Sequence, residues 1–263
     1  MKKLLITSIS ILFSVLLLSG CAAGAAAGQE GKIGLTDGLG REVTLQKPGQ
    51  RIVSLSPSVT EILFALGAGR QVVGRDSFSN YPAEAAAIQD VGGSMGNYSV
   101  ETIASLQPDL VIAAEINTPE QVKALEDMGL TVYYLANPAD LAGIYDMLLT
   151  VGKLSGREAE AEALNQSLKA RVQKVEETVA KAETRPLVFY ELDGTDPAKP
   201  WTAGPGGFLD ELIRAAGGEN AAAGLTSAWA QISIEELLVQ DPDIILLGDS
   251  IYGMTPDQVA GRQ

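Results

Sequence analysis

Histidine is absent from this chain of 263 residues, and cysteine occurs once, as Cys21. A single cysteine cannot form a disulfide within the chain, and a chain without histidine cannot build a Cys₂His₂ or His₃ zinc site. The same absence removes the base of a Ser-His-Asp or Cys-His catalytic centre. Most hydrolase classes are therefore excluded, and we expect no enzyme activity, no resident metal and no cofactor.

Positive charge is also scarce, because 19 Lys and Arg face 33 Asp and Glu and leave a net charge of −14. Binding to nucleic acid depends on cationic neutralisation of phosphates, so a nucleic-acid partner is not expected. Hydrophobic residues make up 46% of the chain and charged residues 20%, which favours a packed core over disorder. A chain of this length predicts two lobes of ordinary size.

No hydrophobic run is long enough for a permanent membrane span of about 20 residues. The apolar run Leu4–Leu18 follows Lys2 and Lys3, and this layout predicts a signal peptide over residues 1–20. The segment Leu18-Ser-Gly-Cys21 resembles the bacterial lipoprotein box. The resemblance implies that Cys21 is lipidated, becomes the new amino terminus and anchors the protein to a membrane outside the cytoplasm, in a periplasm or on the outer face of the cell membrane.

An internal repeat organises the rest of the chain. Residues 99–112 (SVETIASLQPDLVI) are echoed by residues 233–246 (SIEELLVQDPDIIL), with the same spacing from Ser to Pro. Each copy reads as a helix N-cap, a short helix, a Pro-Asp stop and an apolar run typical of a buried parallel strand. The repeat predicts an α/β fold of two lobes of related topology with parallel sheets.

The predicted boundaries follow from this repeat and from composition. Ser155–Lys181 is rich in Ala, Glu and Lys and contains no proline, so it predicts one long helix that joins the lobes. The second lobe stops a few residues into the helix opened by Pro256, and symmetry with the first lobe predicts that it is incomplete. The expected parts are a lipidated flexible tether 21–30, an N-terminal lobe 31–153, a linker helix 154–183 and a C-terminal lobe 184–263.

Within the N-terminal lobe, strands and helices are expected to alternate. The predicted strands are Ile52–Leu55, Val72–Gly74, Leu110–Ala113 and Val132–Leu135, and the predicted helices are Ser58–Leu66, Val100–Leu106 and Pro119–Met128. The sequence Ser58-Val-Thr-Glu61 predicts a capping box at the first of these helices.

Four segments follow one another along the chain and carry a family resemblance: Arg51–Gly67, Ser77–Pro82, Pro108–Ile112 and Ala216–Asn220. Together they resemble the substrate-binding proteins of bacterial ABC importers, in the group with two Rossmann-like lobes joined by one long helix, which serves cobalamin, ferric siderophores and haem. The resemblance implies capture of a corrinoid or ferric siderophore, whose metal is cobalt or iron, and delivery to a permease dimer. Haem is less favoured because no histidine can ligate its iron, although tyrosine could.

The cleft of such a fold is expected at the carboxyl ends of the strands, where open α/β sheets bind ligands. The candidate ligand-binding residues in or beside these loops are Ser56, Pro57, Phe78, Tyr81, Met95, Tyr98, Tyr190, Trp201 and Trp229. The resemblance implies ligand-facing positions for four of them, Phe78, Met95, Trp201 and Trp229. Met95 stands where the enterobacterial cobalamin binder has an aromatic residue, and each candidate aromatic has simple packing as its alternative.

Glu101 and Glu235 occupy equivalent places in the two copies of the repeat, just inside a helix amino terminus. An acid there stabilises the helix dipole by about 0.3–1 kcal/mol without any partner. The resemblance implies a second role, in which one glutamate per lobe meets arginines of the permease.

Two other hypotheses remain open. Gly92-Gly-Ser94-Met-Gly96 matches the G-x-S-x-G nucleophile elbow, which suggests a lipid-anchored serine hydrolase using Ser94, although its base could not be histidine. The other is a structural lipoprotein that binds no ligand.

Overall fold

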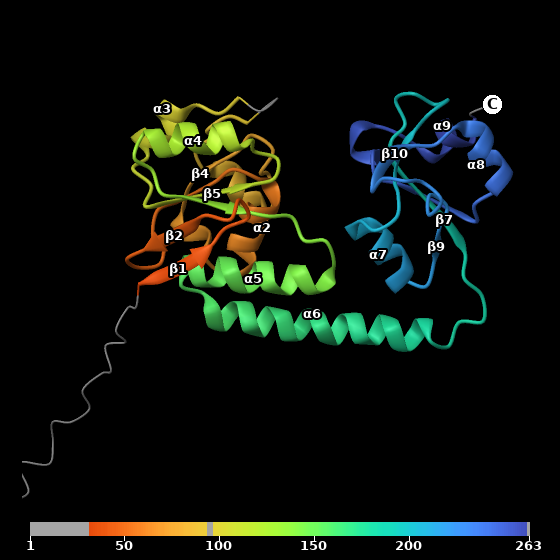
Figure 1. Ribbon diagram of the computed structural model, residues 1–263, viewed down its shortest axis with the longest axis horizontal. Helices are drawn as coiled ribbons and strands as arrows, with labels where there is room; N and C mark the ends of the chain where they lie inside the picture. Colours follow the sequence, from red (N-terminus) through yellow and green to blue (C-terminus); the bar gives the residue numbers. More distant parts are fainter. Residues whose placement is uncertain (1–31, 94–96, 262–263) are drawn as a thin grey trace, which may run out of the picture.

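The computed structural model describes residues 32–93 and 97–261. It has two α/β lobes, which stand side by side and are joined by the helices α5 (Leu141–Ser155) and α6 (Glu158–Val179) along one side of the molecule (Figure 1). The predicted two-lobe fold is confirmed. No helix within the described ranges has both the length and the apolar character needed to cross a membrane. The predicted signal peptide, tether and Cys21 lie outside the described residues.

The N-terminal lobe contains a parallel sheet with strand order β4-β3-β5-β6. Its strands are β3 (Ile52–Ser54), β4 (Val72–Arg75), β5 (Leu110–Ala114) and β6 (Val132–Leu135). Its helices are α2 (Pro57–Ala65), α3 (Val100–Ser105) and α4 (Pro119–Asp127), with 3₁₀ turns at Gly69–Gln71 and Ala83–Ala87. The predicted elements of this lobe are confirmed to within one or two residues, because the buried strands read as continuous apolar runs.

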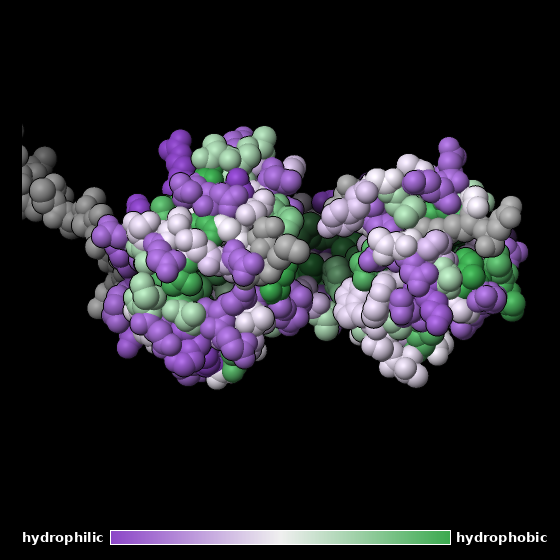
Figure 2. Space-filling view, turned by 90° about the horizontal axis from the view of Figure 1, so that it is seen from above, coloured by the Kyte–Doolittle hydropathy of each residue, from purple (hydrophilic) through white to green (hydrophobic). Residues whose placement is uncertain are grey.

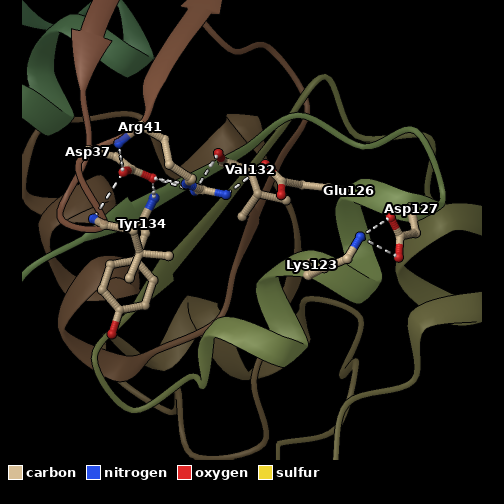
Figure 3. Close-up of polar contacts among 8 residues, drawn as sticks. Asp37, Arg41, Lys123, Glu126, Asp127, Val132 and Tyr134 are labelled. Atoms are coloured by element: carbon tan, nitrogen blue, oxygen red, sulfur yellow. Dashed lines mark hydrogen bonds and ion pairs between the residues drawn. The ribbon is translucent and has the colours of Figure 1, made fainter.

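A hairpin precedes this sheet and was not predicted. It consists of β1 (Ile33–Thr36) paired antiparallel with β2 (Glu42–Leu45). The side chain of Asp37 in the connecting turn is fully buried and accepts hydrogen bonds from the backbone N–H groups of Leu39 and Arg41 at 3.0 Å and of Tyr134 at 3.2 Å. Arg41 Nε donates to the same carboxylate at 2.9 Å (Figure 3). The turn is thereby held against β6.

Arg41 extends this contact to a helix, because its Nη1 lies 2.6 Å from Oε1 of Glu126 on α4 (Figure 3). Burial opposes ionisation of Asp37, but the hydrogen bonds from Arg41 and from the three backbone N–H groups outweigh it and lower the pKa of Asp37. The carboxylate of Asp37 is therefore the ionic centre that joins the hairpin to β6 and, through Arg41, to α4.

The C-terminal lobe contains a mixed sheet with strand order β10-β8-β7-β11, and β9 also pairs with β7. Its strands are β7 (Leu187–Asp193), β8 (Trp201–Ala203), β9 (Glu219–Asn220), β10 (Trp229–Gln231) and β11 (Ile244–Leu247). Its helices are α7 (Phe208–Ala215), α8 (Ile234–Gln240) and α9 (Pro256–Ala260), with a 3₁₀ turn at Ser250–Tyr252.

The prediction of a parallel sheet in the C-terminal lobe is wrong for part of it. β11 and β9 run parallel to β7, but β8 runs antiparallel to both β7 and β10. The reason is the short connection 194–200 between β7 and β8, since a parallel crossover needs a dozen or more residues. That this lobe is incomplete stays a prediction.

The linker was predicted as one helix over 154–183, and α6 occupies most of this range; the helix α5, which precedes it, was not predicted. α5 ends at Gly156, whose φ of +69° places it in the left-handed region that stops a helix. α6 then runs for 22 residues, about 33 Å. The two helices pack closely, because a Cβ atom added to Gly152 would come within 2.7 Å of Cβ of Ala161.

We predict that Asp37→Asn lowers the free energy of unfolding by about 1–2 kcal/mol at pH 7, because the charged acceptor of the hairpin is lost. The pKa of Asp37 is lowered in the folded protein, so its stabilising contribution is present above the unfolded value of about 3.9 and is lost as the pH falls through the folded value. The difference between variant and wild type should therefore shrink in urea titrations taken stepwise from pH 7 to pH 2.

Asp127→Asn is the matched control, because Asp127 forms an exposed ion pair with Lys123 on α4 (Figure 3). Its effect should stay below about 0.5 kcal/mol. A loss for Asp37→Asn that is no larger than that of the control would contradict the role given to Asp37.

Candidate functional site

A cavity of about 740 Å³ lies between the two lobes. Seen from the side opposite α6, the molecule has a waist between the lobes, and hydrophobic residues are visible deep in this gap (Figure 2). The lining residues come from both lobes and from both linking helices: Ser58, Glu61, Ile62, Glu115, Asn137, Pro138, Ala139, Ile144, Met147, Leu148, Leu164, Leu168, Gly206, Gly207, Phe208, Leu209 and Trp229. The size and mixed lining are those of a ligand site.

The linking helices supply an apolar part of this cavity. α5 contributes Ile144, Met147 and Leu148, and α6 contributes Leu164 and Leu168. These side chains share one seam because they recur at helical spacings of three and four residues. A ligand in the cavity would therefore cover apolar surface that the two helices leave open to water.

The charges around this cavity have one sign. Glu61 on α2 and Glu115 after β5 are exposed carboxylates of the lining, and within the described part of the chain no Lys or Arg lines it. Unpaired carboxylates repel anionic groups of a ligand. The cavity is therefore suited to a neutral or cationic molecule.

Two tryptophans mark the wall formed by the C-terminal lobe. Trp229 lines the interlobe cavity, and Trp201 lines a neighbouring cavity of about 660 Å³. In the β8–β10 ladder Trp229 pairs with Ala203, two residues after Trp201. The two indoles are consequently diagonal neighbours on one face of the sheet, within reach of each other's contacts. Both are partly exposed, at 42% for Trp201 and 51% for Trp229.

The loop that carries Phe78 is fixed by hydrogen bonds to the buried carboxyl group of Asp76. Asp76, at the end of β4, is 1% exposed and accepts the N–H of Phe78 at 2.9 Å and the hydroxyl of Ser79. Ser79 also hydrogen-bonds Thr60 on α2 at 2.8 Å. Burial raises the pKa of Asp76 against these hydrogen bonds. Phe78 is left 53% exposed at the carboxyl end of the sheet and does not line the interlobe cavity.

The predicted capping box at Ser58 is wrong. Ser56 caps α2 by accepting the N–H of Val59 at 3.3 Å, and Pro57 occupies the first turn, a position that suits its fixed φ. Ser56 is consequently buried at 3% exposure, whereas Ser58 is exposed and lines the interlobe cavity. Pro57 is half-buried between them.

Three candidate tyrosines are placed outside the lining of the interlobe cavity. Tyr98 donates to the carbonyl of Leu55 at 3.0 Å and accepts from Asn117 at 2.7 Å, and burial raises its pKa. Tyr81, 66% exposed, lines a groove on the flank of the N-terminal lobe. Tyr190 lines an apolar groove over β7 and β11. Ligand binding by these tyrosines stays a prediction, and Ser94 and Met95 lie outside the described residues.

The model of a family described as periplasmic binding protein matches residues 52–262. The chain belongs to the periplasmic binding protein family. It is 32% identical over 258 residues to the uncharacterized ABC transporter substrate-binding lipoprotein YvrC of Bacillus subtilis, covering 92% of this chain and 80% of the relative. It is 33% identical to a cobalamin-binding protein of Halobacterium salinarum over 81% of this chain, but spans only 58% of that relative.

Solved structures of similar proteins share this fold. The periplasmic vitamin B12 binding protein BtuF of Vibrio cholerae matches with a TM-score of 0.67 and 27% identity, over 82% of this chain and 83% of that one. The periplasmic heme-binding protein RhuT of Roseiflexus matches with a TM-score of 0.68 and 32% identity, over 78% and 79%. These relatives are binding proteins, and nothing among them supports the hydrolase hypothesis.

In this periplasmic binding protein the two repeated glutamates lie on equivalent helices. Glu101 is in the first turn of α3, which is capped by Ser99, and Glu235 is in the first turn of α8, which is capped by Ser233. Both glutamates are exposed. α3 and α8 lie on the side of the molecule away from α6 (Figure 1). One acid of each lobe is therefore presented on the same side, outside the interlobe cavity.

Proposed function

We propose that this protein captures a cobalamin-type corrinoid between its lobes, presents it to the permease of an ABC importer, and is held at the membrane by a lipid on Cys21. The observation that carries the proposal is the cavity of about 740 Å³ to which both lobes and both linking helices contribute. Its apolar seam and the indole of Trp229 suit the broad apolar surface of a macrocycle.

Electrostatics favour a corrinoid over the other ligands of similar size. Haem carries propionates and ferric catecholates are anionic, so both would meet the uncompensated carboxylates Glu61 and Glu115. The periphery of cobalamin carries neutral amides instead. The chain also contains no histidine to ligate haem iron. The names of the relatives from Halobacterium salinarum and Vibrio cholerae support the same choice.

We predict that the purified protein binds cyanocobalamin with micromolar or higher affinity, and more tightly than haem or a ferric catecholate. Trp229→Ala should weaken the binding by about 30-fold, because a buried aromatic contact contributes about 2 kcal/mol. Isothermal titration calorimetry with the three ligands measures both effects.

The control is Leu238→Ala, which removes an exposed side chain of α8 away from the cavity and should leave the affinity unchanged. The absence of cyanocobalamin binding at 100 μM protein, or tighter binding of haem, would contradict the corrinoid proposal.

We predict that Glu101→Lys combined with Glu235→Lys lowers corrinoid uptake at least fivefold while changing the dissociation constant for cyanocobalamin less than twofold. Exposed ion pairs contribute only about 0.2–1 kcal/mol each, so they govern encounter and register with the permease, and reversal turns attraction into repulsion. Uptake of labelled cyanocobalamin by cells and calorimetry on the purified variant give the two readings.

Glu162→Lys reverses an exposed charge on α6, on the opposite side of the molecule, and should leave uptake unchanged. If the double variant lost ligand affinity in parallel with uptake, the two glutamates would belong to the ligand site instead.

We predict that Cys21→Ser moves the protein from the membrane fraction to the soluble extracytoplasmic fraction, because serine offers no thiol for the lipid. Fractionation followed by immunoblotting checks this, with metabolic labelling by palmitate as the second reading. Cys21→Ser protein that stays in the membrane fraction without label would exclude a lipid on Cys21 as the anchor.

A further inference from the structure

The second cavity, of about 660 Å³, lies within the C-terminal lobe. It is lined by Leu192, Asp193, Thr195, Trp201, Asp249, Tyr252 and Met254, which end β7, follow β7 or β11, or begin β8. β7 and β11 are parallel, with Leu247 opposite Glu191, so their carboxyl ends meet at one edge of the sheet. This is the edge at which α/β sheets bind ligands.

One of the two carboxyl oxygens of Asp249 has no hydrogen-bond partner among the described residues. Asp249 is 5% exposed, and its Oδ2 accepts the N–H of Gly194 at 2.9 Å, across the two loops. Its Oδ1 is buried and has no hydrogen-bond partner anywhere in residues 32–93 and 97–261. A buried acceptor without a partner destabilises the folded protein and calls for a functional explanation.

This cavity adjoins the interlobe cavity through the tryptophan pair. Trp201 lines the one, Trp229 lines the other, and the β8–β10 register makes them diagonal neighbours on the same sheet face. A molecule that covers Trp229 between the lobes can therefore extend a peripheral group past Trp201 toward Asp249.

A second carboxyl group faces the same space. Asp193 pairs with Trp201 across β7 and β8. Hydrogen bonds from the backbone N–H and the hydroxyl of Thr195 lower its pKa, so it is ionised at neutral pH. A carboxylate on the ligand would meet this charge and find no donor at Oδ1 of Asp249.

We propose that this cavity is a subsite for an N–H donor on the periphery of the ligand, accepted by Oδ1 of Asp249 beside the indole of Trp201. The inference rests on the proposed corrinoid function and adds a specificity determinant to it. The side-chain amides of a corrinoid are neutral N–H donors, whereas the side chains of haem are carboxylates. An analogue without this N–H donor would leave the buried acceptor unpaired in the complex, so the site would bind it more weakly.

The test compares cyanocobalamin with its three monocarboxylates, in which one peripheral propionamide (b, d or e) is hydrolysed. Wild type and Asp249→Asn are titrated with each by calorimetry. The variant keeps an oxygen for Gly194 but places an NH₂ group where Oδ1 was. We expect it to bind cyanocobalamin about tenfold more weakly, with a melting temperature equal to or above that of wild type.

We also expect one monocarboxylate to bind wild type at least tenfold more weakly than cyanocobalamin, and this penalty to shrink at least fivefold in Asp249→Asn, since the two changes remove the same hydrogen bond. Asp196→Asn, an exposed change in the same loop, is the control and should match wild type throughout.

The outcomes separate the two proposals. Cyanocobalamin affinity within twofold of wild type in Asp249→Asn, or the same monocarboxylate penalties in both proteins, overturns the subsite and leaves the corrinoid function intact. If wild type binds none of the four corrinoids, the corrinoid function fails and the subsite fails with it.

Discussion

The close packing of α5 against α6 is the constraint on which the rest of the structure depends. Gly152 leaves no room for a Cβ atom beside Ala161, and Asn165 of α6 donates to the carbonyl of Tyr145 on α5 at 2.9 Å. The backbone N–H of Leu141 at the start of α5 also donates to Glu211 of the C-terminal lobe at 2.9 Å. The lobes are thus held apart at a set distance, so a ligand meets preformed walls and the ordering cost of binding is small.

Three of the buried aspartates, Asp37, Asp76 and Asp249, differ in how fully their carboxyl groups are hydrogen-bonded. Asp37 accepts from three backbone N–H groups and from Arg41, and Asp76 accepts from Phe78 and Ser79. Within residues 32–93 and 97–261, the side chain of Asp249 accepts from the N–H of Gly194 and from no other group. The first two are explained by the loops that they fix. For the third, the proposed N–H donor of the ligand would supply the partner that its Oδ1 lacks.

The sequence predicted the fold well where periodicity and caps were strong. The strand runs near Ile52, Leu110 and Val132 and the Ser99 and Ser233 caps appear where expected. The antiparallel β8 was missed because its sequence Trp-Thr-Ala forms no β-branched apolar run like the Ile52-Val53 of the equally short β3. α5 was missed because its start depends on the N-cap Asp140 and because composition favoured the more polar α6.

The site was harder to predict than the fold, because cavity walls are set by tertiary placement. Trp201 and Trp229 share a sheet face through the β8–β10 register, which no local pattern reveals. Tyr98 and Tyr190 lie in loops or strands near the expected edge, yet their side chains line other pockets. The positions of Asp76 and Asp249 could have been recognised in the sequence. Asp76 directly follows β4, and Asp249 is the second residue after β11, so both lie at the carboxyl ends of strands. A charged residue at that point is placed where a loop or ligand needs an acceptor.

The two lobes are alike at the helices α3 and α8, which carry the repeated glutamates, and unlike where they line the interlobe cavity. The two proposed partners account for this difference. A permease dimer presents the same surface twice, so one equivalent glutamate per lobe matches its symmetry. A corrinoid has two unlike faces, so walls that remained identical would fit only one of them. The N-terminal lobe accordingly offers Ser58 and Glu61 from a helix over a parallel sheet, whereas the C-terminal lobe offers tryptophans from antiparallel strands. With the proposed partners, the unlike walls match a ligand with two unlike faces, and the equivalent outer helices match a symmetric permease dimer.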